Sequence, residues 1–528
     1  MNGPARQVGA IVRTDILFRF RRTAAVVTML VIAASVYFIV PDTGTGRTLM
    51  QISGRRVLYN SAAVALGTGM FCGLILSMLG YYLIGNSFRR DIVSRTGFVV
   101  ASTPVTNARY LLGKFCGNVL YLASVMTACM LSAMVMFLIR GEGWLQPFVF
   151  LGTYAWIALP GIAFCSAVSL AFESLPFLSG RAGDVLYFFL WAAFLGFPAA
   201  MFESNGGAQW LAAFDITGIV PVIGQMQDQF HTTSMSIGSS TFDASLPPVL
   251  YPGLNWGWGM IGMRCSTLIL PGALVGLASL WFHRFDPARI KLSIRHSRRN
   301  VLARINALLK PVTRSLQPLA SLLQRRGNGT SFLNAVGADV LATLLLSPLT
   351  AVGIAVFSVL SLALDASSMQ GGLLPALIVV LILALADLTP RDGASGMLSL
   401  LYTAPGLRTR YVLWKFVSAL IITLLFALIP ILRLSFSNPS AALSLAVGSG
   451  FIAGGAVGLG VLARSQKPFI AFFLMLLYIS LNAPEAPVFN FAGFSGHTDP
   501  GVQLGYALAT ALLLFAGYAR HKAALKKL

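Results

Sequence analysis

Two polar segments of this chain carry charged and hydroxyl side chains at the same spacing. The first, residues 90–115, reads RDIVSRTGFVVASTPVTNARYLLGKF, and the second, residues 391–416, reads RDGASGMLSLLYTAPGLRTRYVLWKF. They align without a gap and share nine of 26 positions, including an Arg-Asp pair, a proline and a final Arg-Tyr-x-x-x-Lys. Unrelated segments of this length share far fewer residues, so the chain contains an internal repeat.

The residue types in the repeat suit ion pairing and docking rather than catalysis. The tyrosine and lysine of each copy are four residues apart and therefore share one helix face, from which we expect the lysine to reach lipid headgroups. Asp91 and Asp392 are suited to cap a short helix, which the Thr-Pro or Ala-Pro pair then ends. The sequence thus predicts the same helix–turn–helix in both copies.

Other residues that could do chemistry do not form a recognisable site. The five histidines are scattered over loops and span ends, without an HExxH motif. The five cysteines lie within or beside apolar runs and include no CxxC pair, which favours neither disulfides nor zinc. The stretch LLGKF lacks the first glycine and the hydroxyl of a phosphate-binding loop. We therefore expect no catalytic residue, metal or cofactor in this chain.

The composition is that of a polytopic membrane protein. Of 528 residues, 56% are hydrophobic and only 10% are charged, and the mean hydropathy is +0.77. Long, unbroken apolar runs predict helices rather than barrel strands. We predict twelve spans, which lie near residues 23–40, 58–85, 115–138, 148–170, 184–201, 263–283, 348–364, 373–387, 416–433, 441–463, 468–482 and 501–519. The eighth and eleventh runs barely reach bilayer length.

The distribution of basic residues predicts the orientation. With the N-terminus inside, the cytoplasmic segments hold 32 of the 38 Lys and Arg residues, as the positive-inside rule expects. Residues 41–57 are the exception, because this external loop contains three arginines. The same rule accounts for the net charge of +21, so we expect no nucleic-acid partner.

The spans divide into two parallel sets of six, which predicts an all-α membrane protein built from two repeats. The predicted domains are residues 1–283, a basic cytoplasmic linker at 284–330, and residues 331–528. An interfacial amphipathic helix precedes each set; in the first, Ile11, Val12, Ile16 and Leu17 oppose Arg13 and Arg19. VGAIV at residues 8–12 aligns with VGADV at 336–340.

The repeated segment resembles the loop between the second and third spans of ABC-2 type exporter permeases. In that family this loop couples the permease to an ATP-binding subunit. The resemblance therefore implies a coupling role for a set of residues that comprises Arg90, Asp91, Arg95, Phe98, Val99, Pro104, Arg109, Tyr110, Lys114, Arg391, Asp392, Leu400, Leu401, Pro405, Arg410, Tyr411 and Lys415. The second copy departs from the first where Gly97 and Gly113 become Leu398 and Trp414.

The resemblance implies the membrane subunit of an ATP-driven exporter, with no enzymatic activity of its own. Two copies of an ATP-binding cassette subunit would bind the ATP and magnesium, and an amphipathic or hydrophobic substrate such as a lipid, peptide or antibiotic would pass between the two halves. The expected location is the bacterial inner membrane, with both termini in the cytoplasm. Two alternatives are an ion-coupled secondary transporter and a membrane-embedded enzyme or scaffold. The scarcity of ionisable groups deep in the spans disfavours the first.

The two halves differ in the external region that follows the fifth span. The first half has a long region there, residues 202–262, which is rich in Gly, Trp and Phe, whereas the second has only residues 483–500. We expect residues 202–262 to fold over the outer mouth as short or re-entrant helices and to act as a lid.

Overall fold

A computed structural model describes residues 3–21, 23–175, 177–178, 180–204, 213–282, 285, 301–318, 321, 332–403, 406–483, 487–494 and 499–526. Contacts divide the chain into two compact units. Unit 1 comprises Met1–Ser179 and Leu186–Lys291, and unit 2 comprises Gly180–Val185 and Leu292–Leu528. Helix α8 (Arg181–Ser204) begins in unit 2 and continues in unit 1. The residues predicted to form a separate linker include α12 (Val301–Leu309), which belongs to unit 2.

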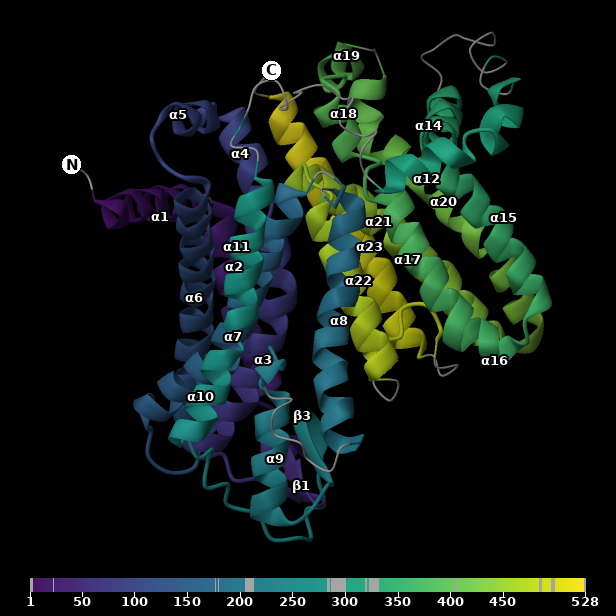
Figure 1. The fold of residues 1–528 in the computed structure, drawn as a ribbon. Coiled ribbons are helices and arrows are strands. Elements are labelled where there is room, and N and C mark those ends of the chain that lie inside the picture. The colour runs from purple at the N-terminus through teal and green to yellow at the C-terminus, as the bar shows by residue number, and fades with distance from the viewer. Residues whose placement is uncertain are drawn as a thin grey trace. The chain divides into compact units, whose positions relative to one another are not determined.

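Unit 1 is mainly helical (Figure 1). Besides the larger part of α8 it contains α1 (Pro4–Phe20), α2 (Thr23–Ile39), α3 (Ser61–Ile84), α4 (Ser87–Val93), α5 (Thr96–Ser102), α6 (Asn107–Arg140), α7 (Pro147–Ser174), α9 (Ile219–Phe230), α10 (Trp258–Ser266) and α11 (Ile269–Trp281). Small residues allow α3 and α7 to pack closely, since a Cβ atom on Gly73 would lie 3.3 Å from the Ala158 Cα. Helices α1, α4 and α5 lie at one end of this unit, which we call its basic end.

Unit 2 is also mainly helical (Figure 1). After α12 come α14 (Phe332–Leu346), α15 (Pro348–Ala363), α16 (Ala366–Ser368), α17 (Leu374–Leu385), α18 (Pro390–Ala394), α19 (Leu398–Thr403), α20 (Leu407–Ser437), α21 (Pro439–Ala463), α22 (Lys467–Asn482) and α23 (Pro500–Leu525). Local sequence sets several boundaries; for example, the Asn438 side chain accepts a hydrogen bond from the Ala441 amide and caps α21. Helices α14, α18 and α19 mark the basic end of unit 2.

The structure is that of an all-α polytopic membrane protein, and each of the twelve predicted spans falls on a helix or helix pair. Within the described residues, eight helices are long and apolar enough to cross a membrane, and α14 with α15 would make a ninth. The pair α14–α15 is bent by 91° at Ser347. The other predicted spans fall on α2, α8 and α22; α22 and the apolar part of α2 are shorter than a bilayer requires.

In each unit an arginine near the C-terminal end of the helix that follows the hairpin, α6 or α20, caps an earlier helix. Arg140 of α6 donates hydrogen bonds to the carbonyls of Tyr37 and Val40, at the end of α2. Arg433 of α20 donates to the carbonyls of Ser361 and Leu364, at the end of α15. Cations satisfy the last carbonyls of a helix well, so the two units share a structural device that the sequence alignment did not detect.

The segment that follows α8 in unit 1 contains a strand in addition to the predicted short helices. Strand β3 (Met235–Thr241) pairs antiparallel with β1 (Arg47–Ile52), which also pairs with β2 (Arg55–Arg56). The β1–β2 turn places Ser53 and Gly54 at positive φ, as a two-residue hairpin requires. The described part of residues 202–262 thus contains α9, the start of α10 and β3, and the partner of β3 lies far away in the sequence, at residues 47–52.

A buried arginine anchors the segment around α9 to the long helices of unit 1. Pro160 lies inside α7 and has no N–H, so the carbonyl of Trp156 lacks its usual helical donor. Arg264 of α10 is fully buried, and its Nε donates to that carbonyl at 2.8 Å. Its Nη1 donates to the carbonyl of Asp215 at 2.5 Å, while the Asp215 carboxylate accepts from the Val220 amide at the start of α9. Arg264 therefore joins α10, α7 and the segment before α9.

Candidate coupling site

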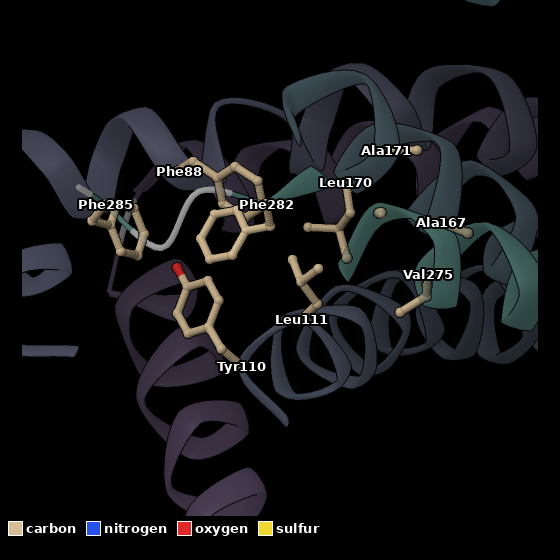
Figure 2. Close-up of a cluster of buried hydrophobic side chains, with 10 residues drawn as sticks. Phe88, Tyr110, Leu111, Ala167, Leu170, Ala171, Val275, Phe282 and Phe285 are labelled. Atoms are coloured by element: carbon tan, nitrogen blue, oxygen red, sulfur yellow. The ribbon is translucent and has the colours of Figure 1, made fainter. Parts of the chain in front are cut away.

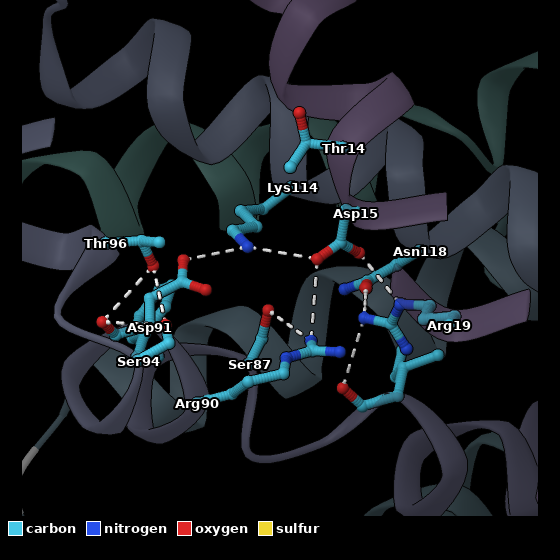
Figure 3. A network of polar contacts seen from close by, with 12 residues as sticks. Thr14, Asp15, Arg19, Ser87, Arg90, Asp91, Ser94, Thr96, Lys114 and Asn118 are labelled. Atoms are coloured by element: carbon cyan, nitrogen blue, oxygen red, sulfur yellow. Dashed lines mark hydrogen bonds and ion pairs between the residues drawn. The ribbon is translucent and has the colours of Figure 1, made fainter. Parts of the chain in front are cut away.

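In unit 1 the repeated charged residues form a buried cluster around Asp15 of α1 (Figure 3). Lys114 of α6 lies between two carboxylates, 3.0 Å from Asp15 Oδ1 and 2.8 Å from Asp91 Oδ2. Arg19 donates from Nε to Asp15 Oδ2 at 2.8 Å, and Arg90 of α4 approaches Asp15 Oδ1 at 3.5 Å. The cluster therefore joins α1, α4 and α6 through ion pairs that are largely shielded from water.

The cations around Asp15 set its protonation state. Burial favours the neutral form, but Arg19, Lys114 and Arg90 outweigh burial and lower the pKa of Asp15 to about 2. Because the pKa in an unfolded chain is about 3.9, the stabilisation by ionised Asp15 is complete above that value and is lost as the pH falls toward 2. The ion pairs of Asp15 are thus unaffected by pH changes near neutrality.

Unit 2 contains an equivalent cluster around Asp339 of α14. Lys415 of α20 lies 2.9 Å from Asp339 Oδ1 and 2.8 Å from Asp392 Oδ2. The Tyr411 hydroxyl donates to Asp392 Oδ2 at 3.0 Å, and Arg391 forms an ion pair with Asp339. In unit 1 the Tyr110 hydroxyl donates to Asp91 in the same way, at 2.5 Å. The repeated Arg, Asp, Tyr and Lys thus have the same partners in both units.

These contacts correct three expectations from the sequence. Asp91 and Asp392 do not cap a helix, because each carboxylate binds the tyrosine and lysine that lie 19 and 23 residues later. The lysines do not extend toward headgroups, since the Lys415 side chain is only 1% exposed. Arg19 does not lie on a solvated face of α1, because it is buried beside Asp15. A buried lysine keeps its charge only with such partners.

The aspartate at the centre of each cluster was not identified from the sequence. The alignment of VGAIV with VGADV paired Ile11 with Asp339. In the structure Asp15 occupies the position equivalent to Asp339, one helical turn further along α1. A single aspartate in each helix before the first span was the signal that could have revealed the pair. Both aspartates lie outside the repeated segments 90–115 and 391–416, so the alignment of these segments could not pair them.

The hairpin formed by α4 and α5 extends from this cluster. Glu173, at the end of α7, accepts hydrogen bonds from the amides of Ser87 and Phe88 and so caps α4. We call α5 the tip of this hairpin. In it Val99 is 64% exposed, and Phe98 is half-buried. The other predicted coupling residues divide similarly: Arg95 and Pro104 are exposed, whereas Arg109 is half-buried and donates to Gln7 Oε1.

The hairpin of unit 2, formed by α18 and α19, has a similar exposed apolar residue. Met397, directly before α19, is 48% exposed, Leu401 is half-buried and Arg410 is exposed. Of the remaining predicted coupling residues, the side chain of Leu400 and the whole of Pro405 lie outside the described part of the structure. The assignment of these tips to coupling stays a prediction.

An aromatic cluster packs against the hairpin of unit 1 (Figure 2). The Tyr110 ring stacks on Phe282, with 5.4 Å between centroids, and Phe88 and Phe285 pack against both rings. In unit 2, Tyr411 stacks instead on His521 of α23 at 5.2 Å. In each unit, therefore, the tyrosine that binds the hairpin aspartate also stacks on a ring at or near the end of the unit's last long helix, α11 or α23.

This cluster explains why the first copy has glycine at position 97. A Cβ atom on Gly97 would lie 2.9 Å from the Phe285 ring. We expect Gly97→Ala to displace Phe285 and to destabilise unit 1 by about 1–3 kcal/mol, as overpacking does. Thermal unfolding of the purified protein measures this effect. Gly393→Ala in unit 2 is the control, because nothing lies near its added Cβ, and equal melting temperatures for both variants would contradict the argument.

Comparisons with known proteins agree with the topology. No curated protein and no solved structure matches the chain significantly. Within the described residues, no three His, Cys, Asp or Glu side chains are grouped to hold a metal ion. A family model described as ABC-2 family transporter protein matches residues 57–223, which include helices α3 to α8. The chain is thus a multi-pass membrane protein, and its residues 57–223 are similar to ABC-2 family transporters. The matched residues contain the hairpin and all of its charge cluster except α1.

Proposed function

We propose that this chain is the membrane subunit of an ATP-driven exporter. Two copies of a separate ATP-binding cassette subunit would bind ATP and magnesium, each docking on one hairpin. The observation that carries this proposal is the duplicated charge cluster, which in each unit lies at the base of a hairpin with an exposed apolar residue at its tip. The ABC-2 match supports the same class of function for the region around the first hairpin.

The cluster suits a coupling role because it joins three helices rigidly. Asp91 lies on α4, Lys114 on α6 and Asp15 on α1, so a displacement of the hairpin is passed to both other helices through short ion pairs. Separating these ions without water would be costly, which makes concerted movement the favoured response. The exposed tip supplies the contact surface, and the buried residues transmit its movement.

Composition and topology support a proposal for the substrate class and the membrane. The apolar spans favour an amphipathic or hydrophobic substrate, such as a lipid, peptide or antibiotic-like molecule. The basic ends of both units would face the cytoplasm of a bacterial cell, with both chain termini on that side.

The docking proposal is tested by placing a charge at the hairpin tip. Val99→Asp would bury an unpaired carboxylate in an apolar contact, so we expect at least a tenfold loss of the ATP-binding subunit that co-purifies with the permease. Mass spectrometry of the affinity-purified complex, with ATP hydrolysis by that complex, measures the loss. Met397→Asp makes the same test in unit 2, where we expect a smaller loss.

Val99→Thr is the matched control, because it keeps the shape of the side chain without adding a charge. Both variants should reach the membrane at wild-type levels, since Val99 lies outside the core. If Val99→Asp and Met397→Asp together leave co-purification and ATP hydrolysis unchanged, the hairpins do not dock an ATP-binding subunit.

A further inference from the structure

Unit 2 contains a cavity that neither the charge cluster nor the hairpin uses. Its volume is about 310 Å³, and it lies between α12, the start of α8 and the junction of α14 with α15. Arg181, Asn306 and Lys310 supply its polar groups, while Leu302, Leu346 and Pro348 are among its apolar walls. None of the described residues that line it is acidic.

The backbone around the cavity is fixed by specific contacts. Asn306 Oδ1 accepts a hydrogen bond from the Leu349 amide at 2.9 Å, which joins α12 to the first turn of α15. Arg181 donates to the Leu383 carbonyl at 3.1 Å and lies 3.7 Å from Asp387, which is outside the cavity lining. These contacts fix Arg181 and Asn306 at the cavity before any ligand enters, and Lys310 lines the same space.

The bend at Ser347 indicates the level of the cavity in the membrane. Because α15 is apolar and α14 turns from it by 91°, α14 runs along the membrane surface if α15 crosses the bilayer. The junction then lies at headgroup depth. Leu346, on the cavity wall, is 70% exposed, as expected for a residue that contacts acyl chains rather than water.

We propose that this cavity binds the phosphate of an anionic glycerophospholipid. Arg181 and Lys310 would pair with the phosphate, and Asn306 would hydrogen-bond to the headgroup. The acyl chains would lie over Leu346 and Pro348 and continue into the bilayer. A zwitterionic lipid fits less well, because none of the described lining residues carries a carboxylate to pair with its ammonium group.

The test measures binding of phosphatidylglycerol to the full-length protein in detergent by native mass spectrometry. We expect Lys310→Gln to weaken the first bound phosphatidylglycerol about fivefold, the effect of one cation near an anionic lipid. Ala307→Phe should weaken it at least as much without changing any charge, because Ala307 lines the cavity and the ring would fill it. Phosphatidylcholine should bind weakly to all forms.

Arg304→Gln is the matched control, since Arg304 is an exposed cation of α12 that does not line the cavity. It should leave phosphatidylglycerol binding unchanged. An equal loss with Arg304→Gln, or no loss with Ala307→Phe, would show diffuse attraction to basic residues and overturn the proposal. Displacement of the lipid by equimolar glycerol 3-phosphate would also overturn it, by identifying a site for a soluble phosphate ester.

Discussion

Replacing Lys415 by methionine is expected to destabilise unit 2 by about 3–5 kcal/mol, because two largely buried carboxylates, Asp339 and Asp392, are then left with Arg391 as their shared cation. Lys415 lies within 3 Å of both Asp339 and Asp392 and is almost completely buried. The loss should appear as a large decrease in the melting temperature of the purified protein. Lys522→Met, an exposed lysine of α23, should change the melting temperature little.

The two units should differ in their sensitivity to this change. Lys114→Met is expected to cost less than Lys415→Met, because Asp15 keeps both Arg19 and Arg90 as partners. Adding Asp392→Asn to Lys415→Met removes one of the two carboxylates that lost Lys415, so that Arg391 has only Asp339 to neutralise, and should restore part of the lost stability. If the double variant is less stable than Lys415→Met alone, the ion pair between these residues does not account for the effect.

Replacing Arg264 by methionine is expected to destabilise unit 1 by about 3 kcal/mol or more. The variant leaves the carbonyls of Trp156 and Asp215 without their donor in a buried environment, where each unsatisfied group is costly. Limited proteolysis of residues 213–262 and thermal unfolding should both detect the loss. Arg55→Met, an exposed arginine of β2, is the control and should behave like the wild type.

A second substitution tests the role of Pro160 in this arrangement. Pro160→Ala restores the N–H that the Trp156 carbonyl lacks within α7, so it should recover part of the stability lost in Arg264→Met. In the wild-type background the same substitution should gain little, since Arg264 already satisfies that carbonyl. Strictly additive effects of the two substitutions would mean that Arg264 acts through another contact.

The sequence predicted the helices well because their signal is local. Long apolar runs specify membrane helices without reference to distant partners, and all twelve predicted ranges coincide with helices. The repeated Arg, Asp, Tyr and Lys were also identified as related groups, since a gapless match preserves spacing. What each of them contacts was not predictable, because Asp15 and Asp339 approach Lys114 and Lys415 from helices 99 and 76 residues away.

The sheet formed by β1, β2 and β3 was not predictable from the sequence for the same reason. Strand β3 is short and rich in serine, so its alternation is weak, and its partner β1 lies in a loop that was notable only for its arginines. Arg264 lies at the start of the predicted span 263–283, but its role depends on a carbonyl freed by Pro160 on another helix. Side-chain contacts between distant segments determine both features, and periodicity carries no information about them.

The proposed docking of an ATP-binding subunit at the hairpin tip can be tested directly by site-specific photo-crosslinking in native membranes. A benzophenone side chain at Val99 should crosslink to a second polypeptide, which mass spectrometry should identify by a phosphate-binding loop sequence. The same group at Arg89, which is exposed on α4 below the tip, should give much less of this product. Equal crosslinking from both positions, or crosslinks from Val99 to lipid alone, would contradict the proposed docking of an ATP-binding subunit at the hairpin tip.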